Sequence, residues 1–467
     1  MAVVQLAFAL VSYTVFLDHE EAEFLSPALS LLAISALLFV SGARLDTARI
    51  GFRDALVFAV ATWCVAGFAG AVPIIQITGV SITDGVFESI SALTTTGATV
   101  LSGLDALPKT FLLYRQFLQW LGGLGIVIFV VAVLPMLNVG GMRLLRMETP
   151  GPMKDDKVSP RIAKTAHHLW LVYVVLTLLC ALSYYLVGMS PFDAVAHSFS
   201  TVSTGGFSTH DASLGYFNSH LVLFVSNIFM LAGAINFALH FRVWKTHKLH
   251  RYWRDEEFRI FLFVVFVLSM LITVGLVREN HYTDATEAAS YALFHLVSFI
   301  TSTGFGASDF TDWPLSVVFL LFVAGYIGGC AGSTAGGNKI VRNILTMKVL
   351  GREIKRLIHP SGTFIVKYQG KSVDDDVVSA TISFMCFAAF FSVFISLLLM
   401  ATGLDFWSSL SAVAACLNVL GPAFGKLSSN FQAVSDVGTW LLSATMVLGR
   451  LEYFTVLALF SRYFWRH

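Results

Sequence analysis

Four short stretches of the chain contain glycine, accompanied by hydroxyl residues in the first three, and recur with a period of roughly 100 residues. They are 94–99 (Thr-Thr-Thr-Gly-Ala-Thr), 203–207 (Ser-Thr-Gly-Gly-Phe), 302–306 (Ser-Thr-Gly-Phe-Gly) and 418–422 (Asn-Val-Leu-Gly-Pro). Glycine adopts φ > 0 without strain and lets backbones approach closely, so successive carbonyls can point at one axis. Rings of backbone carbonyls can replace the hydration shell of a monovalent cation. The pattern predicts a cation site built from main-chain oxygens.

Each stretch follows an amphiphilic segment that is too short to cross a membrane. These segments lie near 84–95, 191–202, 286–301 and 406–417. We expect helices whose beginnings are capped at Asp84, Ser190-Pro191, Asp284 and Asp405. Their C-terminal ends carry partial negative charge, which favours a cation in the cavity they face. One such turn is typical of any loop tip, but fourfold recurrence indicates a shared role.

The segments between these turns are those of a membrane protein. Hydrophobic residues make up 56% of the 467 residues and charged residues only 13%, against about 25% charged in soluble domains. Net charge is +1 and no basic tail is present, so nucleic acid is not an expected partner. About ten apolar segments are long enough to span a bilayer. They lie near 2–17, 25–43, 54–76, 111–136, 167–187, 219–241, 258–277, 313–349 with a break, 379–402 and 439–461.

Basic residues indicate the orientation of these spans. Lysines and arginines gather in loops within 44–53, 143–164, 242–254 and 339–367, and in the C-terminal tail. Such loops remain on the cytoplasmic side. We therefore expect both termini to be cytoplasmic and all four glycine turns to face outward.

Two features lie in the predicted spans beneath the turns. The run 328–338 (Gly-Gly-Cys-Ala-Gly-Ser-Thr-Ala-Gly-Gly-Asn) cannot remain a stable helix, because each interior glycine costs about 1 kcal/mol. Unwound backbone at membrane depth must face water or protein. A phosphate-binding loop is excluded because no Gly-Lys-Ser/Thr follows. Arg450 lies mid-helix, where a charge costs at least about 2.5–3.5 kcal/mol. It should face a pore or a partner, since Glu452, two residues on, is not on its face.

These motifs resemble the Trk/Ktr superfamily of potassium transporters. The resemblance rests on the four turns and on 119–125 (Gln-Trp-Leu-Gly-Gly-Leu-Gly), 203–211 and 328–337, and covers nearly the whole chain. Two extra leading helices resemble the TrkH/TrkG type. The resemblance implies an all-α membrane protein with four tandem M1–P–M2 repeats (helix, re-entrant pore helix, helix) around one central pore. The implied divisions are 1–46 for the two leading helices and 47–148, 149–254, 255–368 and 369–467 for the repeats.

The resemblance also implies site residues. A selectivity filter carries over to Thr95, Thr96, Gly97, Ser203, Thr204, Gly205, Ser302, Thr303, Gly304, Val419, Leu420 and Gly421. An intramembrane gate carries over to Gly329, Gly332, Ser333, Thr334, Gly336, Gly337 and Arg450, with Arg450 near the loop and able to hold its carbonyls. The fourth turn departs most, with Val419 and Leu420 in place of hydroxyl residues, although backbone carbonyls are retained.

The implied function is K⁺ uptake across a bacterial-type cytoplasmic (inner) membrane. K⁺ is the transported ion, bound at the filter, and no organic cofactor is expected. The implied partners are a second copy in a homodimer, a cytosolic nucleotide-binding regulatory ring of TrkA type, and the lipid bilayer.

Two alternatives remain. An ion-coupled secondary transporter, using Na⁺ or H⁺, would have inverted repeats and a midplane carboxylate, whereas these repeats run parallel. A membrane-embedded enzyme would need clustered acid, base or metal-binding residues, and no predicted span contains such a cluster. Among other polar residues, Glu88 fits either cation entry or a structural role, Arg115 an interfacial anchor, and His197 and His295 packing or capping.

Overall fold

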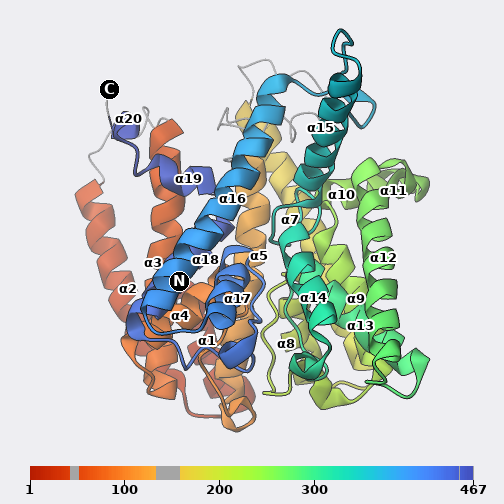
Figure 1. Ribbon diagram of the computed structural model, residues 1–467. Helices are drawn as coiled ribbons and strands as arrows, with labels where there is room; N and C mark the ends of the chain where they lie inside the picture. The colour runs from red at the N-terminus through yellow and green to blue at the C-terminus, as the bar shows by residue number, and fades with distance from the viewer. Residues whose placement is uncertain (43–51, 133–157, 452, 466–467) are drawn as a thin grey trace.

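The computed structural model describes residues 1–42, 52–132, 158–451 and 453–465 (Figure 1). Much of two predicted cytoplasmic loops, 44–53 and 143–164, and Glu452 lie outside these ranges. The described chain is almost entirely helical, which confirms the all-α prediction. Its one sheet is a hairpin of β1 (Lys367–Tyr368) and β2 (Lys371–Ser372).

Helices occupy all ten predicted spans. The uninterrupted ones are α2 (Glu21–Gly42), α3 (Phe52–Thr78), α5 (Lys109–Ala132), α7 (Val158–Leu186), α12 (Glu256–Arg278) and α16 (Asp375–Ala401). Large apolar side chains such as Phe39, Phe263 and Phe390 are exposed on them, as expected of surfaces that face lipid rather than water. By length and composition, five described helices can cross a membrane, or six if one bent pair counts as a span.

Of the other five predicted spans, α5 is long and unbroken but is not among these five helices, and the remaining four are short or broken. The first is α1 (Ala2–Val11), continued by η1 (Ser12–Phe16). The interrupted spans are α9 (His220–Ala234) with α10 (Phe237–Thr246), α14 (Leu315–Ile327) with α15 (Ile340–Ile358), and α18 (Asp436–Arg450) with α19 (Tyr453–Ala458). Spans predicted as continuous at 219–241 and 439–461 are therefore each two helices.

The bend between α9 and α10 measures 98°. Its cause is tertiary, because carbonyls at the end of α9 accept hydrogen bonds from the distant 328–339 segment instead of from their own helix. Gly233 O accepts from Thr334 N at 3.2 Å and Ala234 O from Cys330 N at 2.8 Å. The Asn236 side chain then caps α10 by accepting from Ala238 N at 2.8 Å.

Four short helices are present at the predicted amphiphilic segments: α4 (Ile82–Leu93), α8 (Pro191–Val202), α13 (Ala285–Ile300) and α17 (Phe406–Leu417). Ser190, Asp284 and Asp405 cap three of them as predicted. The first prediction was wrong, since Ser81 is the N-cap and Asp84 lies in the first turn, bonded back to Ser81. A serine followed three residues later by an acid forms a reciprocal cap, and the sequence pattern Ser-x-x-Asp carried that signal.

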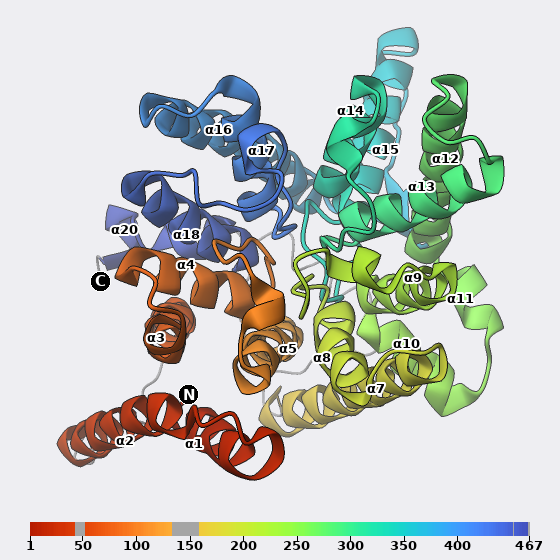
Figure 2. The same cartoon turned by 90° about the horizontal axis from the view of Figure 1, so that it is seen from below.

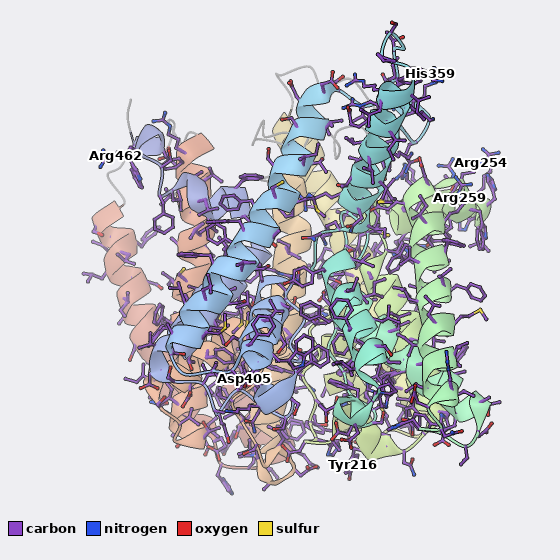
Figure 3. The ribbon with its side chains drawn as sticks, in the orientation of Figure 1. Tyr216, Arg254, Arg259, His359, Asp405 and Arg462 are labelled. Atoms are coloured by element: carbon purple, nitrogen blue, oxygen red, sulfur yellow. The ribbon has the colours of Figure 1, made fainter. Side chains whose placement is uncertain are left out.

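Viewed from below, the helices follow one another around the molecule in chain order, with α1 and α2 outside the others (Figure 2). Arg254, His359 and Arg462 lie at the same end of the molecule as the tip of α15 (Figure 1 and Figure 3). The remaining elements are η3 (Leu104–Ala106), η6 (Ser213–Phe217), η7 (Phe310–Asp312), η8 (Gly425–Leu427), α11 (His250–Arg254) and α20 (Arg462–Trp465).

Candidate cation-binding site

The four turns that end the short helices have the same backbone conformation. Each contains a left-handed residue directly after the helix C-cap, at Thr95 (φ 57°), Thr204 (54°), Ser302 (53°) and Val419 (56°). Two residues later a glycine also has positive φ, at Gly97 (81°), Gly206 (78°), Gly304 (85°) and Gly421 (93°). Positive φ is rare for β-branched residues, so three of the four turns are held in a conformation that their own sequence disfavours.

This conformation corrects the predicted alignment of the second turn. The N–H preceding each glycine closes the turn onto a carbonyl five residues earlier: Thr96 N to Ser91 O, Gly205 N to Ser200 O, Thr303 N to Ser298 O and Leu420 N to Ala415 O. Gly205 is thus equivalent to Thr96, and Gly206 to Gly97. The predicted set Ser203, Thr204 and Gly205 begins one residue early, because two adjacent glycines leave the register ambiguous in the sequence.

The four glycines form a closed ring of contacts between successive turns. A Cβ added to Gly97 would lie 2.1 Å from Gly205 O, and one on Gly206 would lie 1.9 Å from Thr303 O. One on Gly304 would lie 2.2 Å from Leu420 O, and one on Gly421 would lie 2.5 Å from Thr96 O of the first turn. Only glycine fits such approaches. The structure therefore brings together all four stretches found in the sequence.

A cavity of about 710 Å³ opens on this ring and is lined by all four glycines. Asp211 and Asp309 contribute carboxylates to its wall. Among the residues that the structure describes, no cluster of three or more His, Cys, Asp or Glu side chains could hold a metal ion. The oxygens that the four close approaches bring to the ring are the backbone carbonyls of Thr96, Gly205, Thr303 and Leu420.

In the first three segments, the residue six positions before the helix C-cap braces the chain that leaves the turn. Glu88 accepts from Thr99 Oγ1 at 3.0 Å, while His197 Nε2 and His295 Nε2 lie 2.9 and 3.1 Å from the Oγ atoms of Ser208 and Ser308. The equivalent residue in the fourth segment is Ala412, and its neighbour Ser411 donates to Phe424 O at 3.2 Å. The contacts of the two histidines match the packing role predicted for them.

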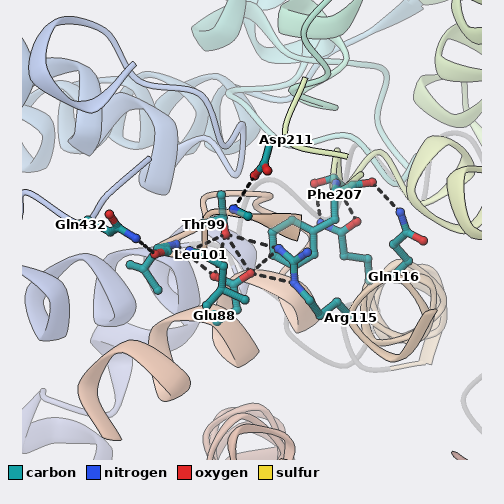
Figure 4. A network of polar contacts seen from close by, with 12 residues as sticks. Glu88, Thr99, Leu101, Arg115, Gln116, Phe207, Asp211 and Gln432 are labelled. Carbon is teal, nitrogen blue, oxygen red and sulfur yellow. Dashed lines mark hydrogen bonds and ion pairs between the residues drawn. The ribbon is translucent and has the colours of Figure 1, made fainter. Parts of the chain in front are cut away.

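Glu88 and Arg115 form an ion pair beside the chain that leaves the first turn, with side chains 0% and 1% exposed (Figure 4). Arg115 Nε donates to Glu88 Oε1 at 3.0 Å, and its guanidinium carbon lies 4.2 Å from the Phe207 ring centroid. Val100 N also donates to Glu88. The interfacial anchor predicted for Arg115 was wrong, and of the two roles considered for Glu88 these contacts favour the structural one. The partners are 27 residues apart, so no local pattern announced the pair.

Two glutamines of α5 hold the second turn (Figure 4). Gln119 Nε2 donates to Gly205 O at 2.6 Å and Gln119 Oε1 accepts from Phe207 N at 3.1 Å. Gln116 Nε2 donates to Phe207 O at 3.1 Å. Gln119 begins the motif 119–125 noticed in the sequence, but neither glutamine was singled out there.

The predicted intramembrane segment is an irregular loop at 328–339 between α14 and α15, which we call the inner loop. Its contacts reach several distant elements. Thr334 Oγ1 donates to Val202 O at 3.1 Å and to Gly233 O at 2.9 Å, at the ends of α8 and α9. Gly336 N donates to Ser302 Oγ at 2.5 Å and Gly337 N to Asn418 O at 3.0 Å, in the third and fourth turns. The inner loop thus lies directly against the ring.

Arg450 ends α18 and reaches the same inner loop. Its Nη1 donates to Thr334 O at 3.1 Å, and its Nη2 donates to Gly122 O of α5 at 3.1 Å. The side chain is buried. A guanidinium therefore bridges two backbone carbonyls from different helical segments beneath the turns, a geometry that suits its fixed fork of donors.

The mouth of the cavity is closed on one side by polar contacts between two outer loops. His210 Nδ1 lies 2.5 Å from Asp105 Oδ1, and Asp211 accepts from Gly103 N and Leu104 N, each at 3.0 Å. The hydrogen bond with His210 lowers the pKa of the Asp105 carboxyl. No local pattern predicted this contact, which joins residues 105 positions apart.

Known proteins resemble this chain over its whole length. A family model described as a cation transport protein, TrkH, matches residues 23–466. A Trk system potassium uptake protein TrkH of Vibrio parahaemolyticus is 45% identical over 469 residues, covering 100% of this chain and 96% of that protein. The TrkH of Escherichia coli K12 is 45% identical, covering 93% and 90%, and its TrkG is 39% identical, covering 91% and 87%.

A solved structure agrees with these sequence matches. The crystal structure of the potassium transporter TrkH from Vibrio parahaemolyticus superposes with a TM-score of 0.92 at 43% identity. The match covers 100% of this chain and 96% of that one.

Proposed function

Because this chain belongs to the TrkH family of cation transport proteins, a family of the Trk/Ktr superfamily, we propose that it is a multi-pass membrane protein that takes up K⁺. Relatives over the full length are named potassium uptake proteins. The ion passes through a pore whose filter is the ring of four turns.

The observation that carries this proposal is the closed contact of the four glycines. Each glycine approaches a carbonyl of the next turn so closely that no side chain fits, and the cavity above opens on all four. Main-chain oxygens at such a ring coordinate a cation without adding formal charge. The filter residues are Thr95, Thr96, Gly97, Thr204, Gly205, Gly206, Ser302, Thr303, Gly304, Val419, Leu420 and Gly421.

The proposed arrangement of the repeats follows from the same family assignment. Four M1–P–M2 repeats at 47–148, 149–254, 255–368 and 369–467 surround the pore, and α4, α8, α13 and α17 are the pore helices. The two leading helices within 1–46 lie outside them. Basic residues gathered near the α15 end support a cytoplasmic position for that end, with the ring toward the outside of the cytoplasmic membrane.

The inner loop and Arg450 form the gate of this pore. The inner loop lies against the ring on the side away from the outer cavity, through Ser302 and Asn418. Arg450 donates to its Thr334 carbonyl, and a buried cation repels K⁺. Conduction then requires the inner loop to leave these contacts. The gate residues are Gly329, Gly332, Ser333, Thr334, Gly336, Gly337 and Arg450.

We further propose that the protein works as a homodimer and that a cytosolic nucleotide-binding ring of TrkA type controls the gate. The name of the relatives, Trk system, supports a transporter with further components. The α15 end, with its basic side chains and the β1–β2 hairpin, is the surface available to such a partner.

The test is ⁸⁶Rb⁺ uptake into liposomes containing the purified chain, with K⁺ or Na⁺ as competitor and with or without a TrkA-type ring. Uptake that K⁺ inhibits more strongly than Na⁺ is expected. Absence of uptake in both conditions, with folded protein in the bilayer, would contradict the proposal.

An ion-coupled secondary transporter is the second candidate. It differs in one measurable respect, because uptake would then depend on a Na⁺ or H⁺ gradient. Flux that persists after both gradients are collapsed favours the gated pore.

A further inference from the structure

Three consecutive acidic residues begin α12, and each is bonded to a different partner. Asp255 caps the helix by accepting from Phe258 N at 2.9 Å and also accepts from Gln369 Nε2 at 2.8 Å. Glu256 accepts from Gln369 N at 2.9 Å and pairs with Lys348. Glu257 accepts from Ala331 N at 2.8 Å. One helical turn therefore contacts both the hairpin and the inner loop.

The hairpin side of this junction joins three elements. Lys348 of α15 donates to Lys367 O at 2.8 Å and lies 5.8 Å from the Tyr368 ring centroid. Tyr368 is buried although it belongs to a two-residue strand. Lys348 of α15 thus contacts both the hairpin and the start of α12, and it holds these three elements together.

The inner side of the junction is buried. Glu257 is 2% exposed. The N–H that donates to it belongs to Ala331, which is next to Cys330, and the N–H of Cys330 itself donates to Ala234 O at the end of α9. A carboxylate that accepts from a backbone N–H makes a charge-assisted hydrogen bond, which is about twice as strong as a neutral one. Glu257 is therefore a strong tether on this part of the inner loop.

We propose that the start of α12 links the cytoplasmic hairpin to the inner loop, with Glu256 contacting the hairpin and Glu257 positioning the inner loop. Neighbouring residues of one helical turn move together, so a protein partner that displaces the hairpin or α15 pulls on Ala331 through the helix backbone. This inference rests on the proposed function, since it identifies how a partner reaches the gate.

The chain carries its own reporter for this movement. Cys330 is adjacent to Ala331 and is 1% exposed, so it reacts with a small methanethiosulfonate reagent only when the inner loop leaves its place. In a chain with Cys64, Cys180, Cys386 and Cys416 replaced by alanine, the modification rate of Cys330 measures release of the inner loop.

Glu257→Ala should raise the Cys330 modification rate about tenfold or more, the size expected for losing a charged hydrogen-bond partner. Glu257→Gln keeps an oxygen acceptor and should stay within about threefold of the parent. A purely structural role would slow or speed both variants alike. A parental rate in a folded Glu257→Ala chain, or equal rates for the two variants, would overturn the tether.

Lys348→Met tests the hairpin side without touching the buried carboxylate. It removes the contact with Glu256 and should raise the Cys330 rate by about threefold. Arg352→Met is the matched control, because Arg352 lies one turn farther along α15 and pairs with Glu353 and Asp375 rather than with α12. If Lys348→Met and Arg352→Met react at the same rate, the link to the hairpin is overturned.

The outcome is separable from that of the proposed function. Thiol modification can be measured without ion flux. In the same way, ⁸⁶Rb⁺ uptake by the parent chain can be measured without the thiol reagent. Failure of uptake contradicts K⁺ transport, and unchanged thiol rates contradict only the link through α12.

Discussion

The ring of turns and the inner loop beneath it are both irregular backbone, but they are held in opposite ways. Each turn is closed by bonds within its own segment, such as Thr96 N to Ser91 O, and the first three are also braced from a position six residues before the C-cap. The inner loop is instead held by single bonds from separate elements, including Val202 O, Asn418 O and the Glu257 carboxylate.

Because they are bonded differently, the ring of turns and the inner loop should respond differently when a neighbouring element shifts. Local bonds repeated in four equivalent places support one another, and breaking one leaves the other turns closed. Bonds contributed one at a time by distant elements are each modest, about 0.5–1.5 kcal/mol net. They can be exchanged when any of those elements shifts, which is why we propose the inner loop, and not the ring, as the gate.

The largest effect should come from breaking the ring itself. Gly304→Ala places a Cβ 2.2 Å from Leu420 O at a φ of 85°, so the turn must move. We expect ⁸⁶Rb⁺ uptake to fall about 100-fold or more, from the combined cost of overpacking and left-handed backbone. Gly306→Ala is the control, since nothing lies within 4 Å of its Cβ position. Equal uptake by the two variants would show that the close approach is unimportant.

The next effect concerns the charged brace of the first turn. Glu88→Ala leaves the Arg115 guanidinium buried without its carboxylate, which should cost about 3–5 kcal/mol of stability. Thermal unfolding in detergent measures this as a large fall in Tm. Asp84→Ala, at the exposed start of the same helix, should lower Tm much less. A small fall for Glu88→Ala would mean that Arg115 finds another partner.

The next prediction concerns the contact between Arg450 and the inner loop. Arg450→Ala removes the donors to Thr334 O and Gly122 O and the positive charge. We expect ⁸⁶Rb⁺ flux without a partner to rise about tenfold, the factor for roughly 1.4 kcal/mol. Arg450→Lys keeps the charge but loses the two-pronged contact, so it separates electrostatic repulsion from tethering. Unchanged flux in a folded Arg450→Ala protein would remove Arg450 from the gate.

The smallest effect is expected at the mouth of the cavity, where Asp105 contacts His210. The pKa of Asp105 is lowered by its hydrogen bond to His210, so the contact stabilises the fold above the ordinary aspartate pKa of about 4 and is lost as pH falls through the lower folded value. Asp105→Asn should reduce stability by less than about 1 kcal/mol near neutral pH, because the carboxyl is half exposed. The Tm difference from the parent should vanish in acid. A difference that grows in acid would contradict this sign.

The contrast between local bonds and bonds from distant elements also explains what could be predicted from the sequence. The short helices and their turns were predictable because glycine, caps and amphiphilic segments are local signals that recur four times. The inner loop was predictable as unwound from its glycines, and Arg450 from the cost of a buried charge. The Glu88–Arg115 pair, the bend after Ala234 and the bond from Ala331 to Glu257 were not, because each depends on residues far apart in sequence. The register of the second turn failed for a different reason, since Gly205 and Gly206 are equally permissive.

Val419 and Leu420 make the fourth turn chemically different from the other three, which is possible because one chain supplies all four turns. In an assembly of identical subunits, a single codon change alters every quarter at once. Here one polypeptide contributes all four, so a substitution at Val419 or Leu420 leaves the hydroxyl-bearing turns untouched. In the proposed filter, ion preference can therefore be adjusted one quarter at a time, a finer step than a symmetric channel allows.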